Sequence, residues 1–218
     1  MKNVLIATPC LDGKVDAWFV NSLYESAKLG LQNDVMFQPV FLANESILPM
    51  ARNELLNLAY QQGYDDLVFI DDDEEWKAEV LLEIVQSSKD VVAVPVVNKG
   101  DKKVEYNVYG IDKNPDPLDG YLKIDRCGTG FLKLSKNVIK DLWESNPECV
   151  FRGRKLKYIC EYNLINDAFV GEDIMLCEKI KELGYQIWLN PKHTVSHIGT
   201  KKFKGCLLYT SPSPRDRS

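Results

Sequence analysis

The chain has 218 residues, which is enough for one domain with a sizeable core, or one domain with a small addition. A hydrophobic content of 45% and a charged content of 27% are those of an ordinary globular protein. The formal net charge of −5 argues against a general nucleic-acid binder, which would show a basic face.

The first half of the chain alternates expected strands with expected helices. Short apolar, β-branched runs predict strands, and apolar residues at helical spacing predict helices. The expected strands are residues 3–7, 34–41, 67–70 and 90–97, and the expected helices are residues 16–29, 49–62 and 77–87. This alternation predicts an α/β fold with a Rossmann-like, mostly parallel sheet that helices cover on both faces.

Two of these helices carry more detailed expectations. In the first, Gly30 should end the helix. Its inward face should consist of the apolar residues at helical spacing, which are Phe19, Val20, Leu23, Tyr24 and Ala27. In the second, capping chemistry from 44–46 precedes Pro49, and Gly63 ends the helix.

The order changes after residue 98. Residues 99–123 are polar and rich in Asp, Asn, Pro and Gly, and they leave room for edge strands at 104–109 and 121–124. Later elements are expected at 131–134 and 186–189 (strands) and at 137–144 and 171–183 (helices). Residues 146–166 look irregular and contain a basic run at 152–157.

The start of the chain does not resemble an export signal. Its first apolar run spans only Val4 to Ala7, and no later stretch is long and apolar enough to span a membrane. The six cysteines show no CxxC spacing. We therefore expect reduced thiols in a cytoplasmic protein with no integral membrane segment.

The last thirteen residues, 206–218, shift abruptly to Ser, Pro and Arg. Residues 206–216 resemble the translation of a transposon-type sequencing-library adapter. We therefore expect 206–218 to be a non-native tail, with a natural C-terminus missing; the alternative is a genuine disordered tail.

Five consecutive acids, 71–75, follow the expected strand at 67–70. Like charges at close range raise one another's pKa values unless a cation lies among them. Mg²⁺ and Mn²⁺ take carboxylate oxygens, and ligands of open α/β sheets bind beyond the carboxyl ends of the strands. The stretch therefore indicates a metal and an anionic ligand, and the alternative is a solvated acidic turn that begins the next helix.

The order of five short motifs resembles that of the GT-A glycosyltransferases, particularly the small single-domain enzymes related to family 2 of bacterial and phage genomes. The motifs are ARN at 51–53, FIDDD at 69–73, GTGF at 128–131, GED at 171–173 and HIG at 197–199. None is specific by itself, and the resemblance depends on their order from about Val4 to Gly205. It implies a single GT-A domain over 1–205, with a nucleotide-binding half at 1–98 and an acceptor half at 99–205.

The resemblance implies a metal site for Mn²⁺ or Mg²⁺ and a nucleotide-sugar donor, UDP- or GDP-linked. Asp71 and Asp73 match the acids of the DxD motif, so Asp73 would hold the metal and Asp71 would face the metal and the ribose or base. Asp72 occupies the variable position. His197 matches a late histidine that reaches the metal or the diphosphate, although a lone histidine is also commonly structural.

The resemblance implies catalysis by the acidic pair that opens the helix at 171–183. Asp173 matches the general base of inverting relatives, which takes a proton from the attacking hydroxyl. Glu172 would contact the acceptor or position the helix. The alternative is that both acids stand there only because the helix dipole favours negative charge at the start of a helix.

Further donor contacts are implied in four places. Arg52 would approach the nucleotide, and a solvent-facing helix charge is the alternative. The segment after the first strand would meet the nucleobase, Lys99 would meet the diphosphate, and a glycine-rich turn would let backbone approach the donor sugar or acceptor. The segment after the first strand contains Thr8, Pro9 and Asp12. The glycine-rich turn consists of Gly128, Thr129 and Gly130.

These features favour a metal-dependent glycosyltransferase with an acceptor hydroxyl on a glycan, lipid, protein or modified nucleic acid. Inversion and retention both stay open. A sugar-phosphate nucleotidyltransferase normally needs a Gly-rich, basic loop after the first strand, whereas 8–14 has one Gly and one Lys. An aspartate-nucleophile phosphatase needs a small hydroxyl residue after its second Asp, where Glu74-Glu75 stand. An inactive nucleotide-sugar-binding module is the non-enzyme alternative.

Overall fold

The structure is a computed structural model that describes residues 1–100, 104–199, 202–205 and 207. Apart from Leu207, the expected non-native tail at 206–218 lies outside the described residues.

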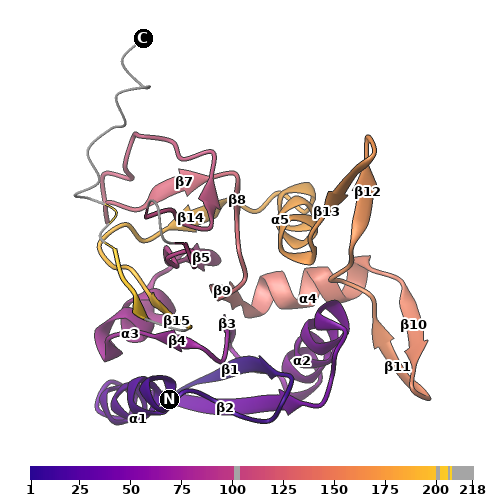
Figure 1. The fold of residues 1–218 in the computed structure, drawn as a ribbon, viewed down its shortest axis with the longest axis horizontal. Helices are drawn as coiled ribbons and strands as arrows, with labels where there is room; N and C mark the ends of the chain where they lie inside the picture. Colours follow the sequence, from indigo (N-terminus) through magenta and orange to yellow (C-terminus); the bar gives the residue numbers. More distant parts are fainter. Residues whose placement is uncertain (101–103, 200–201, 206, 208–218) are drawn as a thin grey trace.

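A seven-stranded sheet in the order β2-β1-β3-β9-β5-β14-β7 forms the centre of the domain (Figure 1). Its strands are β1 (Lys2–Cys10), β2 (Val35–Ala43), β3 (Asp66–Ile70), β5 (Val91–Ala93), β7 (Leu122–Ile124), β9 (Phe131–Ser135) and β14 (Ile187–Leu189). Five run in one direction, whereas β9 and β7 are antiparallel to their neighbours. The predicted α/β class with a mostly parallel sheet is confirmed. The insertion of β9 between β3 and β5 was not predicted, because it joins elements far apart in sequence.

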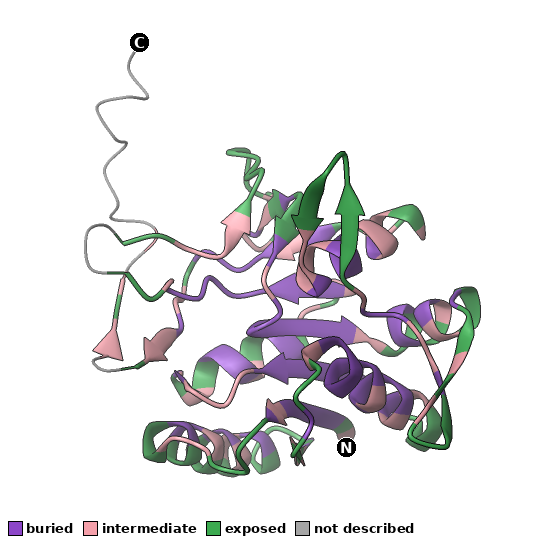
Figure 2. Ribbon diagram, turned by 45° about the vertical axis from the view of Figure 1, so that its right-hand side comes forward, coloured by how far each residue is buried: buried purple, intermediate pink, exposed green. Residues whose placement is uncertain are grey.

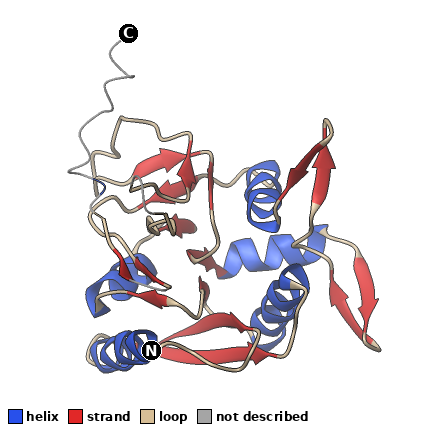
Figure 3. Cartoon of the chain, viewed as in Figure 1, coloured by secondary structure: helices blue, strands red, loops and turns tan. Residues whose placement is uncertain are grey.

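Helices cover both faces of the sheet (Figure 3), as the sequence predicts. They are α1 (Ala17–Leu31), α2 (Leu48–Gln62), α3 (Ala78–Gln86), α4 (Lys136–Ser145) and α5 (Glu172–Glu182). Successive residues of β3 belong to opposite sides: Val68 and Ile70 pack in the cluster with α1 and α3. Leu67 and Phe69 pack in the cluster with α2, α4 and α5. All four are fully buried, as Figure 2 shows for the central strands, which explains why this strand is an uninterrupted apolar run.

Pro39 lies in the middle of β2, at the edge of the sheet. The Lys2 N–H donates to the Asp34 carbonyl at 2.7 Å, and Lys2 pairs with Val35 in the parallel ladder. The odd-numbered residues of β2 therefore direct their backbone groups away from β1. Pro39 occupies one of these outward positions, where its missing N–H breaks no ladder bond and hinders pairing with another chain.

Short strands surround the main sheet. They are β4 (Glu74–Glu75), β6 (Val108–Tyr109), β8 (Arg126–Cys127), β10 (Glu148–Phe151), β11 (Arg154–Lys157), β12 (Asn163–Ile165), β13 (Ala168–Val170), β15 (Ser196–Ile198) and β16 (Lys202–Phe203). The expectation of an irregular segment at 146–166 is wrong, because β10–β11 is a hairpin and β12 opens a second one with β13. Their turns, Arg152-Gly153 and Asn166-Asp167, have positive φ angles at all four residues, the geometry that the type I′ hairpin turn requires.

The inward face of α1 differs from the predicted one. Val20 and Tyr24 are 50% and 61% exposed, whereas Phe19, Ser22, Ser26 and Gly30 are buried. The two serine hydroxyls accept hydrogen bonds from Trp76, at 3.1 Å from its backbone N–H and at 2.9 Å from its indole N–H. The two serines thus allow α1 to pack closely against Trp76.

The predicted helix ends are partly wrong. Gly30 does not end α1, which continues to Leu31. No side chain caps α2 at Ile47, although Glu45 Oε1 accepts the Ile47 N–H at 2.9 Å. Gly63 ends α2 in the left-handed conformation, with a φ of 71°, as predicted.

Within the described residues, every helix is too short or too polar to cross a bilayer. Cys10, Cys127, Cys149, Cys160 and Cys177 are free thiols.

The position of Gly30 gives a stability test. A Cβ atom there would lie 2.7 Å from the Phe37 ring and 2.9 Å from the Val35 carbonyl oxygen. An ordinary Gly→Ala change in a helix stabilises by about 1 kcal/mol, but overpacking costs about 1–3 kcal/mol. We expect Gly30→Ala to lower the free energy of unfolding in urea, because the backbone carbonyl cannot move aside. The exposed Asn21→Ala change in the same helix should slightly raise it, and a stabilised Gly30→Ala protein would contradict this packing.

Candidate functional site

A pocket of about 310 Å³ lies at the carboxyl ends of β1 and β3. Its lining residues are Pro9, Leu11, Glu45, Ser46, Leu48, Asp71, Asp72, Asp73 and His197. This is the edge of the sheet where the acidic run predicts a ligand. The other predicted site residues lie outside the lining; they are Thr8, Asp12, Arg52, Lys99, Gly128, Thr129, Gly130, Glu172 and Asp173.

Strand β15 brings His197 to the acidic run. His197 pairs with Glu74 of β4, and the Ile198 N–H donates to the Asp73 carbonyl at 2.8 Å. His197 Nε2 then lies 3.2 Å from Asp73 Oδ1, and the Lys99 ammonium contacts Asp73 Oδ2. Partial burial works to raise the pKa of Asp73, but the hydrogen bonds from His197 and Lys99 lower it below its ordinary value. Asp73 is therefore a carboxylate in a cationic environment.

The backbone determines the tautomer of His197. Its Nδ1 lies 3.0 Å from the Val97 carbonyl oxygen, which can only accept, so Nδ1 carries a proton. Nε2 therefore donates to Asp73 when the ring carries both protons, whereas in the neutral ring its lone pair is available to a cation held between it and Asp73. Metal-binding histidines are commonly held in this way through their other nitrogen. The donor set of one imidazole nitrogen and one carboxylate fits a divalent cation.

Arg52 joins the two acidic segments beneath the pocket. Its Nη2 lies 3.0 Å from Asp71 Oδ1, and its Nε lies 3.4 Å from Glu172 Oε1. The guanidinium lies 5.2 Å from the centre of the Phe69 ring, and the residue is only 2% exposed. The sequence suggested that Arg52 approaches the nucleotide or faces solvent, whereas the structure places it between two carboxylates. Residues 120 positions apart, 52 and 172, thus hold the two acidic motifs together.

Glu74, which the sequence did not single out, is buried under the acidic run. Burial, followed by the charges of Asp71 and Asp73, raises the pKa of Glu74 well above its usual value, which favours its neutral form. Its carboxyl explains Gly130: a Cβ atom there would lie 2.3 Å from Glu74 Oε1 and 3.3 Å from Asp71 Oδ2. At Gly128 a Cβ atom would instead lie 2.5 Å from Asn107 Nδ2. Both glycines thus let protein groups approach closely.

A second group of possible cation ligands follows β1. One ligand atom each of Cys10, Asp12 and Asp72 lies within 4.8 Å of the others. Burial and then the charge of Asp72 raise the pKa of the Cys10 thiol to about 11, and its Sγ donates to the Lys14 carbonyl at 2.8 Å. A protonated thiol is a poor ligand for Mg²⁺ or Mn²⁺. The Asp73–His197 pair is therefore the better candidate for such a cation.

Other predicted residues have clear positions in the structure. Thr8 is 1% exposed at the end of β1, and Thr129 is 3% exposed. Burial and the charge of Asp73 raise the pKa of Asp72. Asp173 lies in the first turn of α5, partly exposed, and its Oδ1 accepts the Ile174 N–H at 2.7 Å.

Several lining residues carried no sequence signal. Glu45 belongs to a stretch that reads as a helix cap, yet it lines the pocket and its Oε2 lies 3.0 Å from Arg152 Nη1. Arg152 is at the turn of the β10–β11 hairpin, more than one hundred residues later. Such a contact depends on tertiary packing, so no local pattern could have predicted it.

No family model and no curated protein matches this chain. Among solved structures, it is similar to A197 from STIV, with 17% identity and a TM-score of 0.56, over 91% of this chain and 86% of that chain. It is also similar to a nucleoside-diphosphate-sugar pyrophosphorylase from Vibrio cholerae RC9, with 15% identity and a TM-score of 0.44, over 89% of this chain and 94% of that chain. The first likeness shows a shared fold over most of both chains. The second is too weak to carry an argument.

The contacts of Arg52 predict a large effect on stability. Arg52→Met would leave Asp71 and Glu172 together without their shared cation, and breaking a buried ion pair costs about 3–5 kcal/mol. We expect a loss of this size in the free energy of unfolding, measured in urea. Lys155→Met, which removes an exposed ion pair with Glu148, should change it by less than about 1 kcal/mol. Equal effects of the two changes would show that Arg52 does not hold the acids together.

Proposed function

We propose that this chain is a metal-dependent glycosyltransferase of the GT-A type, related to family 2, which moves a sugar from a nucleotide-sugar to an acceptor hydroxyl. The observation that supports it most directly is the contact of Asp73 with Nε2 of His197, at a pocket that Asp71 also lines. Arg52 links this pocket to the start of α5, where the candidate base lies.

On the donor side, Asp73, His197 and Asp71 would hold Mn²⁺ or Mg²⁺. The cation, when bound, would neutralise charge on the nucleotide diphosphate as it leaves. Lys99 already contacts Asp73 and would add positive charge beside the diphosphate.

The remaining donor contacts would come from the loops that follow β1 and precede β9. Pro9 lines the pocket, and Thr8, Asp12 and Asp72 lie on or beside the same turn. We assign them to the nucleobase and ribose of a UDP- or GDP-sugar. The turn of Gly128, Thr129 and Gly130 would border the donor sugar, with Gly130 against Asp71.

On the acceptor side, Asp173 would act as the general base. The Ile174 N–H holds its Oδ1, which orients the carboxylate so that the other oxygen can take the proton of the attacking hydroxyl. Glu172, held by Arg52, positions this helix turn relative to the donor acids. A base on the acceptor side favours inversion at the sugar carbon.

The metal site is tested by thermal-shift measurements with UDP and GDP and their sugars, with and without Mn²⁺, because a bound ligand raises the melting temperature. We expect Asp73→Ala to abolish the Mn²⁺-dependent part of the shift, since it removes the carboxylate that faces His197. Cys10→Ser should retain it, because the thiol belongs to the weaker cation group. Loss in Cys10→Ser with retention in Asp73→Ala would move the cation to the turn after β1.

The base is tested by release of the nucleotide from the nucleotide-sugar that gives the largest shift. We expect Asp173→Asn to lower the turnover roughly 100-fold, a typical contribution of a general base, while the Mn²⁺-dependent shift persists. Asp125→Asn, at an exposed aspartate between β7 and β8, should retain turnover. Undiminished turnover in Asp173→Asn would remove this residue from the mechanism.

The same reagents distinguish the alternative functions. A nucleotidyltransferase would release pyrophosphate from ATP or UTP when given a sugar-1-phosphate. An inactive nucleotide-sugar-binding module would show the thermal shift but no turnover of any donor.

A further inference from the structure

The β12–β13 hairpin exposes apolar side chains on one face. Leu164 pairs directly with Phe169 across the hairpin, so both side chains point to the same side. Tyr162, two residues before Leu164, extends this side, and its ring lies 5.2 Å from that of Phe169. Tyr162, Leu164 and Phe169, here called the apolar hairpin face, are 46%, 70% and 69% exposed.

This face adjoins the candidate catalytic base. β13 ends at Val170, and only Gly171 separates it from Glu172 and Asp173. Tyr162 is close enough to these acids that, after burial, their negative charges raise the pKa of its hydroxyl. When an acceptor places its hydroxyl at Asp173, the part of the acceptor next to that hydroxyl therefore lies beside the apolar hairpin face.

The chemistry of the face indicates hydrocarbon. Its three side chains include two with no polar atom, and none carries a charge. A two-stranded hairpin of three residue pairs is also only marginally stable in water without a surface to pack on. Both points indicate that the apolar hairpin face packs against hydrocarbon and not against water.

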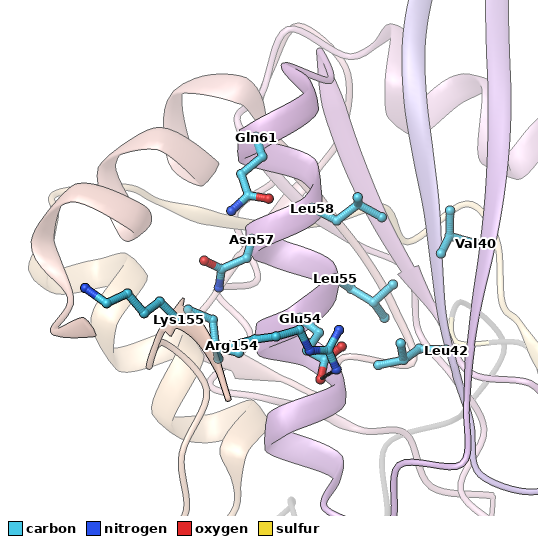
Figure 4. Close-up of a pocket in the computed structure, with 10 residues that line it drawn as sticks. Val40, Leu42, Glu54, Leu55, Asn57, Leu58, Gln61, Arg154 and Lys155 are labelled. Carbon is cyan, nitrogen blue, oxygen red and sulfur yellow. Dashed lines mark hydrogen bonds and ion pairs between the residues drawn. The ribbon is translucent and has the colours of Figure 1, made fainter. Parts of the chain in front are cut away.

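The neighbouring β10–β11 hairpin turns a basic surface to solvent. Arg152 and Arg154 are paired with Glu45 and Glu54, but the arginine side chains are 55% and 63% exposed, whereas those acids are only 3% and 9% exposed. Figure 4 shows Arg154 lying across α2 to Glu54, while Lys155, 73% exposed, extends away from that helix. Lys155 is paired at 2.9 Å with Glu148, which is 51% exposed, so the local excess of outward positive charge comes from the two arginines, whose acid partners are buried.

Both hairpins lie on the right of the molecule in Figure 1, where β12–β13 points upward and β10–β11 points downward. Apolar side chains beside exposed basic residues suit the interface of an anionic bilayer, where the former enter the headgroup region and the latter meet lipid phosphates.

We propose that the two hairpins dock on an anionic lipid surface and that the acceptor hydroxyl is carried by a lipid of that surface. The acceptor role rests on the proposed transferase function, but docking itself requires no turnover.

The test is co-sedimentation of the full chain with vesicles, without nucleotide or metal. We expect it to bind vesicles of equal parts phosphatidylcholine and phosphatidylglycerol and to bind pure phosphatidylcholine more weakly. Leu164→Ser with Phe169→Ser should weaken binding roughly tenfold, because two half-inserted apolar side chains are lost. Lys155→Gln should weaken it roughly fivefold, and only for the anionic vesicles.

The matched control is Tyr24→Ser with Leu31→Ser, which removes two apolar side chains from α1 that are 61% and 58% exposed. It should retain vesicle binding. Thermal unfolding of both double variants checks that they fold. Absence of binding by the unchanged chain, or equal loss in the two double variants, would overturn the proposal.

The thermal shift separates this inference from the proposed function. If the chain gives the Mn²⁺-dependent shift with a nucleotide but ignores vesicles, only lipid docking is overturned. If it binds vesicles through the hairpins but gives no such shift with any nucleotide or nucleotide-sugar, docking stands and the transferase proposal is overturned.

Discussion

The candidate site depends on one buried cation, the guanidinium of Arg52. Removing a charge from water is costly, and the cost is offset here by two carboxylates and by the face of an aromatic ring. Those partners come from two elements: Phe69 lies within β3 and Asp71 directly follows it, and Glu172 begins α5. Arg52 of α2 can contact Asp71 and Glu172 at once only where the end of β3 and the start of α5 both meet α2. These contacts therefore place Asp173, next to Glu172, relative to the acidic run.

The five consecutive acids are compatible with one another because they separate after β3. Asp71 turns to Arg52, Asp73 to His197 and Lys99, and Glu75 to Lys202 at 2.8 Å. Glu74 is buried, which raises its pKa and favours its neutral form, and Asp72 faces the turn after β1. Separate partners therefore reduce the repulsion that the sequence implies. Of the five acids, Asp73 is the one that faces a histidine nitrogen at the pocket.

The pocket draws on both halves of the chain. Most of its lining comes from loops of the first half, but His197 comes from β15, which the ladder with β4 brings beside Asp73. In the proposed function, the donor site would therefore not be complete within residues 1–98. The second half also provides α5 and the two hairpins. In the proposed function the acceptor side would therefore be built from these elements and not from the main sheet.

Elements with a local signal could be predicted from the order of residues alone. The apolar β3 run, the helix α3 and the end of α2 at Gly63 follow from periodicity and backbone sterics, and all three were predicted. The acidic run indicated Asp71 and Asp73, and the family resemblance added His197; all three line one pocket. The inward serines of α1 were missed because hydrophobicity alone does not reveal close packing against Trp76. The insertion of β9, the burial of Arg52 and the orientation of His197 by the Val97 carbonyl were decided only by tertiary structure, since each depends on a partner at least 19 residues away in the chain.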